Sequence, residues 1–326
     1  MPSGQGAGES PFFSPKHKTN EAAKEDLLHI VRRDPRQLGQ EQTRWTLDAI
    51  RKACDWLSTS SVSGVWYVLK RLRIGYKLGR DHVHSPDPNY VEKLADVQRL
   101  LQQAVSSEGR IVLVFNDQLT FFRQPTQAKA WEEKGKTHQP LARRSLRSDT
   151  KARLGATVNA ATGKVTYLLA SRFGIKELIR FYQAVRAAYP QAERIYLVLD
   201  NWPVHFHPDV LAALEPQQTG WELKVPTNWP TQPSVKARRL NLPIQLVPLP
   251  TYASWANPQE KVWRHLQQAE LHLHRLADQW DQLKERVCQH LDQFKDGSQE
   301  LLRYIGLTKN SKLYGSYLSL PLNETG

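Results

Sequence analysis

The 326-residue chain has only two cysteines, Cys54 and Cys288, and neither lies in a CxxC motif or at a spacing typical of a zinc site. We therefore expect free thiols in a reducing compartment. The chain also lacks a long uncharged apolar run and a signal-peptide pattern. These absences predict a soluble, intracellular protein without a membrane partner.

Acidic residues are also scarce relative to basic ones. The chain has 32 Asp and Glu against 45 Lys and Arg, which gives a formal charge of +13 at pH 7. Such a surplus favours a polyanionic partner, most simply nucleic acid, although many soluble proteins are basic without binding DNA. The hydrophobic fraction of 40% is enough for a real core in one large domain or two to three smaller ones.

Three acidic residues stand at positions where regular elements are expected to end or begin. Asp117 closes the apolar run "IVLVFNDQ", and Asp200 closes "RIYLVLDN". Glu260 follows Asn257 and Pro258 and opens a segment with helical periodicity. Carboxylates held together by rigid elements favour Mg²⁺ or Mn²⁺, and in a basic protein such a site suggests metal-assisted chemistry on phosphodiesters.

The N-terminal part is predicted to be helical. Residues 1–20 have the composition of a disordered tail, and residues 21–80 contain two short helices joined by a polar turn, with Thr46 and Ser61 as caps. This pattern resembles a helix-turn-helix, and an ordinary helical hairpin with a solvated basic face is the alternative. The candidate groove contacts on the second helix are Ser63, Trp66, Tyr67, Lys70 and Arg71, of which Trp66 could instead belong to the core.

The rest of the chain is predicted to be α/β. Residues 81–106 are expected to form a linker and a connecting helix, and residues 276–326 C-terminal helices that serve packing or a dimer surface. Between them, residues 107–275 give the element order β-β-β-α-β-α-β-α. That order is typical of an RNase H-like mixed sheet, and the prolines of "IQLVPLP" place the last strand near an edge.

Around the three acids the chain resembles a DDE transposase of the bacterial insertion-sequence (six-thirty family) branch of the mariner superfamily. The resemblance covers roughly residues 34–270 and is carried by "LVFNDQLTFFRQP", "VLDNWPVHFHPDVL" and "PLPTYASWANPQEKVWRHL". The last of these matches the family pattern of a proline-containing strand, a turn, and Asn-Pro-X-Glu-X-X-Trp.

The resemblance implies that Asp117, Asp200 and Glu260 bind two divalent metal ions, Mg²⁺ or Mn²⁺, about 4 Å apart. It implies supporting roles for Asn201, His205 and Asn257. It also implies double-stranded DNA partners, namely terminal inverted repeats and target DNA, a homodimer in the DNA complex, and a bacterial, nucleoid-associated cytoplasmic location.

The chain departs from the family in two places. Gln118 stands where the family usually has an acid, which we expect to matter little because that neighbour is not a ligand. Glu260 also lies unusually far after Asp200, because a basic segment at about residues 219–242 is inserted between them. The inserted segment is either a DNA contact or a solvated surface loop.

Two basic stretches are candidate DNA tracks, although runs of charge are often only solvated. Their candidate contacts are Arg143, Arg144, Arg147 and Lys151 in the first stretch, residues 134–153, and Lys236, Arg238 and Arg239 in the inserted segment. The sequence thus predicts a transposase that binds terminal repeats and cuts and joins DNA. A related nuclease or recombinase, and a remnant that binds DNA without cutting it, are the alternatives.

Overall fold

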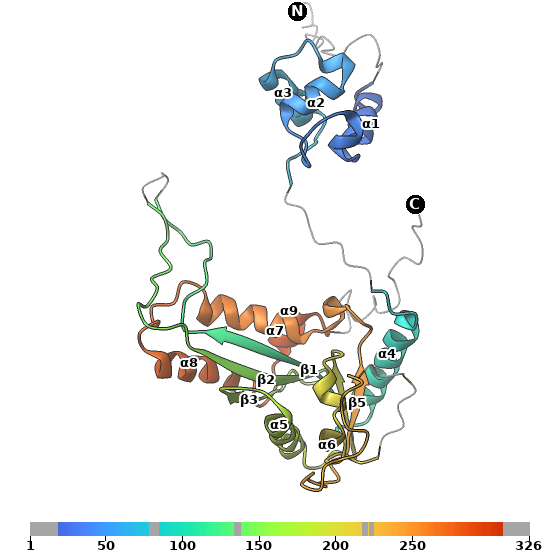
Figure 1. Ribbon diagram of the computed structural model, residues 1–326, viewed down its shortest axis with the longest axis vertical. Helices are drawn as coiled ribbons and strands as arrows, with labels where there is room; N and C mark the ends of the chain where they lie inside the picture. Colours follow the sequence, from blue (N-terminus) through green and yellow to red (C-terminus); the bar gives the residue numbers. More distant parts are fainter. Residues whose placement is uncertain (1–18, 78–84, 134–137, 217–220, 222–224, 309–326) are drawn as a thin grey trace, which may run out of the picture. The chain divides into compact units, whose positions relative to one another are not determined.

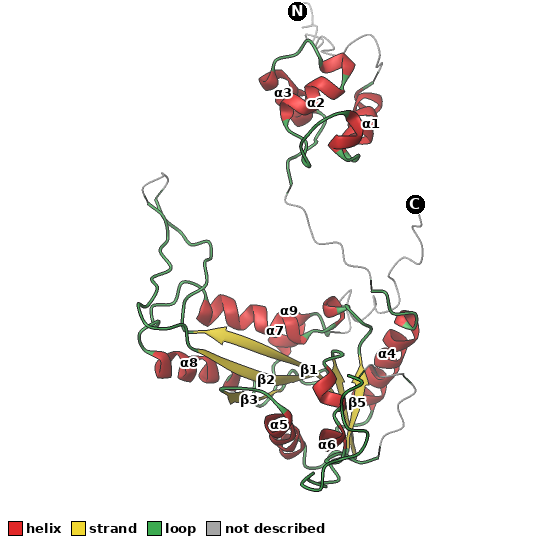
Figure 2. Cartoon of the chain, in the orientation of Figure 1, coloured by secondary structure: helices red, strands yellow, loops and turns green. Residues whose placement is uncertain are grey.

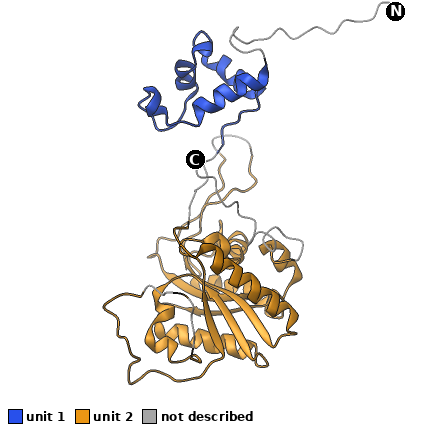
Figure 3. Cartoon of the chain, turned by 90° about the vertical axis from the view of Figure 1, so that its right-hand side faces the viewer, with its two compact units in different colours: residues 1–82 blue, residues 83–326 orange. Residues whose placement is uncertain are grey.

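The structure is a computed structural model that describes residues 19–77, 85–133, 138–216, 221 and 225–308. The predicted tail up to residue 18 and Lys134, Lys136 and Lys224 of the basic segments lie outside these ranges. The chain forms two compact units, residues 1–82 and 83–326, shown in different colours in Figure 3.

The described part of unit 1 contains three α-helices, α1 (Asn20–Val31), α2 (Leu47–Ala53) and α3 (Val62–Arg71). The predicted caps are present: the Thr46 hydroxyl accepts a hydrogen bond from the amide of Ala49, and that of Ser61 from the amide of Gly64. Short 3₁₀ turns occupy Pro35–Leu38 and Asp55–Leu57. The small core of this unit is formed by buried residues from all three helices, including Leu27, Ile50, Val65 and Leu69, and by Leu72 directly after α3.

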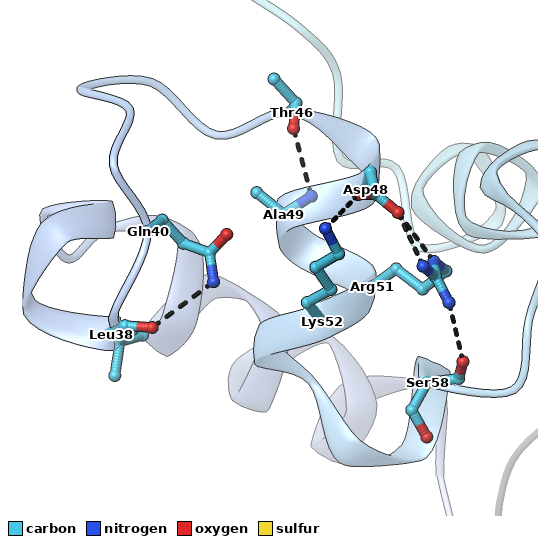
Figure 4. A network of polar contacts seen from close by, with 8 residues as sticks. All are labelled: Leu38, Gln40, Thr46, Asp48, Ala49, Arg51, Lys52 and Ser58. Carbon is cyan, nitrogen blue, oxygen red and sulfur yellow. Dashed lines mark hydrogen bonds and ion pairs between the residues drawn. The ribbon is translucent and has the colours of Figure 1, made fainter.

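Polar contacts hold α2 against the turn that precedes α3, as Figure 4 shows. Asp48 pairs with Arg51 and Lys52, each at 2.8 Å. Arg51 also donates a hydrogen bond of 3.1 Å to the carbonyl of Ser58. Because these groups are partly exposed, their main effect is to fix the geometry of the turn rather than to add much stability.

Unit 2 is built on a five-stranded mixed sheet (Figures 1 and 2). The strands are β1 (Ile111–Phe122), β2 (Lys151–Asn159), β3 (Val165–Ala170), β4 (Arg194–Leu199) and β5 (Ile244–Pro248), in the spatial order β3-β2-β1-β4-β5. The first three are antiparallel neighbours, whereas β1, β4 and β5 run parallel. With α5 (Ile175–Ala188), α6 (Pro208–Leu211) and α7 (Gln259–Leu266), this is the predicted RNase H-like order, with β5 at an edge as expected.

Hydrophobic clusters cover both faces of the sheet because side chains alternate along each strand. Val114 and Leu197 point into a cluster with α5 and α6, and Phe115 and Val198 into a cluster with α7. The second cluster also contains side chains of α4 (Tyr90–Ser106), α8 (Trp280–Asp292) and α9 (Gln299–Ile305). The helix expected as a connection and the C-terminal helices are therefore part of the core of unit 2.

Strand β1 is longer than the sequence indicated. We predicted that it ends at Asp117, but it continues to Phe122. The parallel neighbour β4 ends at Leu199, whereas the antiparallel neighbour β2 stays paired with β1 as far as Phe122. Asp117 thus lies where the parallel pairing has stopped, even though its own strand goes on. Among the described residues, no helix is both long and apolar enough to span a membrane.

Candidate active site

The three acidic residues singled out in the sequence line one pocket of ≈ 440 Å³ in unit 2. Phe115 of β1 is in register with Val198 of β4, so Asp117 and Asp200, each two residues further on, lie side by side. Glu260 reaches the same pocket from the first turn of α7. Adjacent parallel strands and a helix start therefore bring together three carboxylates that are far apart in the sequence.

Two side chains fix α7 on strand β1. Trp263, one turn after Glu260, donates a hydrogen bond of 2.9 Å from Nε1 to Oδ2 of Asp117. Asn257 is buried; its Nδ2 donates to the carbonyl of Asn116 at 2.9 Å, and its Oδ1 accepts from the amide of Gln259 at 3.1 Å. The position of Glu260 relative to Asp117 is thus set by direct bonds between their two elements.

Asn201 and His205 brace the strand end that carries Asp200. Asn201 donates from Nδ2 to the carbonyl of Leu249 at 2.9 Å, which ties the end of β4 to the end of β5. His205 is fully buried, and its Nε2 lies 3.8 Å from Oδ1 of Asp200. The other ring nitrogen, Nδ1, lies 2.7 Å from the hydroxyl of Tyr182 on α5.

Tyr182 is the site neighbour that sequence reasoning missed. It stands in an amphipathic helix among apolar residues, where an aromatic side chain is ordinarily core, and it is indeed fully buried. A buried hydroxyl needs a partner, so a polar tip in the apolar face of α5 is the one signal that could have pointed to it. Gln118, the departure from the family pattern, contacts His205, with 3.3 Å between Gln118 Nε2 and His205 Nε2.

The electrostatics of the pocket follow from burial and from the proximity of like charges. The pKa of Asp117 is raised to about 7, first by burial and then by the negative charges of Glu260 and Asp200. Burial also raises the pKa values of Asp200 and Glu260, and Asp200 raises that of Glu260 further. Since 55% of the Asp200 side chain is accessible, we expect solvent to screen its pKa shift more strongly than that of Asp117. Burial lowers the pKa of His205 to about 3, so the imidazole is neutral at physiological pH.

The pocket suits a divalent cation in donor type and charge. All three acids offer carboxylate oxygens, which Mg²⁺ and Mn²⁺ prefer, and a cation would offset the repulsion that raises the pKa of Asp117. With the side chains as they stand in the described part of the chain, no three His, Cys, Asp or Glu residues are close enough to surround one ion. One oxygen of Asp117 is also bonded to Trp263. Any ion would therefore be shared by pairs of these acids or would draw them closer.

In unit 1, the candidate DNA contacts form a stripe on α3. Ser63, Trp66, Tyr67 and Lys70 are exposed and follow the i, i+3, i+4, i+7 spacing of one helix face, and Arg71 beside them is also exposed. Trp66 does not belong to the core: it is 46% exposed, and the Lys70 ammonium lies 5.1 Å from the centre of its ring.

The basic stretches of unit 2 are surface loops with fixed anchors. Ser145 is buried between the exposed residues Arg143, Arg144 and Arg147; its amide donates to Gln124 at 2.9 Å, and its hydroxyl donates to Asp278. Lys151 begins β2 and is exposed. In the inserted segment, the Ser234 hydroxyl donates to Asp209 at 2.9 Å, and the nearby residues Lys236, Arg238 and Arg239 are exposed.

Comparison with known proteins supports the fold and the family. A family model described as DDE superfamily endonuclease matches residues 112–284. A protein of Shigella sonnei, "Insertion element IS630 uncharacterized 39 kDa protein", is 20% identical over 260 residues, which are 79% of this chain and 67% of that protein.

Solved structures of a mariner transposase share the fold. The Mos1 paired-end complex with Mn superposes with a TM-score of 0.59 at 18% identity and covers 93% of this chain and 78% of that chain. The Mos1 paired-end complex with Mg gives a TM-score of 0.57 at 18% identity and covers 97% and 81%.

Proposed function

Because the chain belongs to the DDE superfamily endonucleases of the insertion-element and mariner group, we propose that it cuts the ends of an insertion sequence and joins them to target DNA. The observation that carries this proposal is the meeting of Asp117, Asp200 and Glu260 in one pocket of an RNase H-like sheet. The surplus of basic residues supports a polyanionic substrate.

Asp117, Asp200 and Glu260 would hold divalent ions, Mg²⁺ or Mn²⁺. Two such ions would supply the activation of an attacking water or 3′-hydroxyl and the stabilisation of the leaving 3′-oxygen. The Mos1 structures obtained with Mn and with Mg support this choice of metals.

The remaining residues of the site would keep the carboxylates in place. Trp263 donates to one oxygen of Asp117, and this hydrogen bond favours the ionised carboxylate. Asn257 keeps α7 on β1, and Asn201 keeps the ends of β4 and β5 together. His205, held neutral by burial, adds no charge to a pocket that must accept cations.

We further propose that α3 of unit 1 reads the terminal repeats, and that the basic loops of unit 2 follow the phosphate backbone. The exposed stripe on α3 supports the first role. The exposed arginines of residues 143–147 and 236–239 support the second, since Lys and Arg bind phosphates without regard to sequence. The paired-end complexes of Mos1 support DNA ends as the substrate, and we propose that this chain acts on such ends as a homodimer.

The test is incubation of the purified chain with DNA that carries the flanking inverted repeats and with a target plasmid, in the presence and absence of Mg²⁺. A transposase produces ends cut at the repeat and joined products, and only with the ion. A related nuclease, the second candidate, cuts without joining. Retention of binding without any cutting, in Mg²⁺ and in Mn²⁺, would identify a non-catalytic remnant and overturn the proposal.

A further inference from the structure

The side chain of Gln118 contacts the buried imidazole of His205. Gln118 follows Asp117 on β1 and points to the opposite face of the sheet, because side chains alternate along a strand. On that face, which α5 covers, the amide nitrogen of Gln118 lies 3.3 Å from Nε2 of His205. Oδ1 of Asp200 lies 3.8 Å from the same ring nitrogen. Gln118 and Asp200 are therefore rival partners of one nitrogen.

The hydrogen bonds of Tyr182 assign the proton of this imidazole. Because full burial disfavours the charged form and Asp200 is beyond hydrogen-bonding distance, the ring of His205 is neutral and has one donor and one acceptor nitrogen. The Tyr182 hydroxyl is also fully buried, and the described residues offer its proton no acceptor other than Nδ1 of His205, at 2.7 Å. A buried donor without a partner is costly, so Tyr182 donates and Nδ1 accepts. The ring proton is then on Nε2.

Gln118 is placed to accept the Nε2 proton. A half-turn of its side-chain amide exchanges nitrogen and oxygen without a change of shape, so that Oε1 meets the N–H group of His205. Without this acceptor the proton would turn to Asp200, because a carboxylate forms the stronger, charge-assisted hydrogen bond. A carboxylate engaged in that way offers less negative charge to a cation, and ligand charge sets the affinity of such sites. Residue 118 thus determines how much of Asp200 is left for an ion.

We propose that Gln118 is a positioning residue of the acidic pocket: it binds the Nε2 proton of His205 and keeps that proton away from Asp200, whose carboxylate is left for a divalent ion. This inference rests on the proposed function, because it takes a divalent ion as the ligand of the pocket. Gln118 is not among the residues that line the pocket, so it acts through His205. As an amide it does so without adding a charge beside the three carboxylates.

The first test observes the ring proton by ¹⁵N NMR of the metal-free, full-length chain with labelled histidine. The signals of His205 are assigned by their change in Tyr182→Phe, which removes the partner of Nδ1. We expect the wild-type ring to carry its proton on Nε2. In Gln118→Met, which keeps the length of the side chain without an amide, that proton should shift downfield as it turns to the carboxylate of Asp200. A wild-type proton on Nδ1, or an unshifted proton in Gln118→Met, would overturn the inference.

The second test measures Mn²⁺ binding without DNA, from the EPR signal of the free ion, with Asp200→Asn to identify binding at the pocket. Gln118→Met should bind Mn²⁺ roughly tenfold more weakly than the wild type, in line with the effect of removing residues behind metal ligands. Gln118→Glu keeps an acceptor for Nε2 and should bind the ion no more weakly. Thr120→Val changes an exposed residue on the same face of β1 and should leave both readouts unchanged.

The outcomes separate the role of Gln118 from damage to the strand that carries it. Equal Mn²⁺ affinity in the wild type and in Gln118→Met would contradict the inference. So would an equal loss of affinity in Gln118→Met and Gln118→Glu, because that pattern marks a disturbed strand rather than a missing acceptor. If the wild type binds no more Mn²⁺ than Asp200→Asn, the proposed function itself fails, which is a different outcome.

Discussion

Units 1 and 2 place their candidate functional residues in opposite environments. In unit 1 the stripe of Ser63, Trp66, Tyr67 and Lys70 lies on the outside of one helix. All four residues therefore come from a single element. In unit 2 the acids come from a strand, a strand end and a helix. Burial raises all three pKa values, and negative neighbours raise those of Asp117 and Glu260 further. The proposed recognition of repeats by unit 1 should therefore tolerate changes at the pocket acids, whereas the proposed chemistry of unit 2 should depend on the long-range register of the sheet.

The largest expected effect on recognition is in unit 1. Replacement of Tyr67 and Lys70 together by Ala should weaken binding to the terminal repeat by roughly 1–3 kcal/mol per side chain, while binding to random DNA changes little. Both residues are exposed, so the melting temperature should stay the same. Fluorescence anisotropy with both DNAs at one salt concentration measures the difference.

The matched control for this pair is Arg32→Ala at the end of α1, an exposed position in the same unit. It removes one positive charge and should leave the preference for the repeat intact. Equal losses on repeat and random DNA in the double variant would mean that α3 supplies only charge, and the contrast between the units would disappear.

The next effect concerns the basic loop of unit 2. Replacement of Arg143, Arg144 and Arg147 by Gln should flatten the plot of log affinity against log salt by up to about three units of slope, one for each lost phosphate contact. All DNA sequences should be weakened alike. Binding titrations over a range of salt concentrations measure the slope.

A charge-matched control replaces three exposed arginines elsewhere in unit 2, Arg99, Arg110 and Arg172, by Gln. The control carries the same net charge and should keep the wild-type slope. Identical slopes in both triple variants would show that residues 143–147 are only solvated surface. A loss of repeat preference at constant slope would show that these arginines read bases.

Asp117→Asn should change how stability depends on pH. The wild-type pKa of about 7 in the folded state lies above the reference value of 3.8, so the folded chain retains a proton that the unfolded chain releases. Stability of the metal-free wild type should thus fall as the pH rises from about 4 to about 7 and remain low above it. The variant lacks this fall and should be the more stable at pH 8, by about 1.4 kcal/mol for each unit of pKa difference.

Denaturant unfolding at pH 5 and pH 8 measures this difference, with Asp96→Asn, at a partly exposed position on α4, as control. Addition of Mg²⁺ at pH 8 should stabilise the wild type more than Asp117→Asn, because the cation offsets the carboxylate repulsion. A variant that is less stable than the wild type at pH 8 would contradict the assignment of repulsion to the acidic pocket.

The smallest expected effect is that of Tyr182→Phe, which removes the hydroxyl bonded to His205. Stability should fall by about 1 kcal/mol, and cleavage should fall severalfold because His205 no longer has its ring orientation fixed beside Asp200. Tyr167→Phe is the matched control, since its hydroxyl bonds to Asp292 on α8. It should cost similar stability without loss of cleavage; equal cleavage by both variants would remove the role of Tyr182.

The sequence was most informative where structure is local. The caps Thr46 and Ser61, the helix beginning at Gln259, and the strand ending before Asp200 all follow from short patterns and are present. The order of strands and helices also followed, because each apolar run is long enough to show its period. The family resemblance then predicted that the three acids that line the pocket act together.

The sequence could not predict what depends on contacts between distant segments. The continuation of β1 past Asp117 is sustained by pairing with β2, about 30 residues later in the chain, and no local pattern encodes it. The bond from Trp263 to Asp117, the bond between Tyr182 and His205, and the left-handed backbone of Tyr252 depend likewise on tertiary packing. These features determine the detailed geometry of the site, whereas its location was already predicted from the acids.

The most direct measurement is the comparison of binding and cleavage by Asp200→Asn on one DNA that carries the terminal repeat. The substitution keeps the shape of the side chain and removes the charge that would hold the ion. We predict wild-type affinity for the repeat and a loss of Mg²⁺-dependent cleavage greater than roughly 100-fold. Mutation of a residue that only hydrogen-bonds to a metal ligand already lowers activity by about 10–100-fold, and loss of a ligand should lower it more. Asp96→Asn, at a partly exposed position on α4 outside the pocket, should cleave normally. Undiminished cleavage by Asp200→Asn would contradict the assignment of the acidic pocket as the catalytic site.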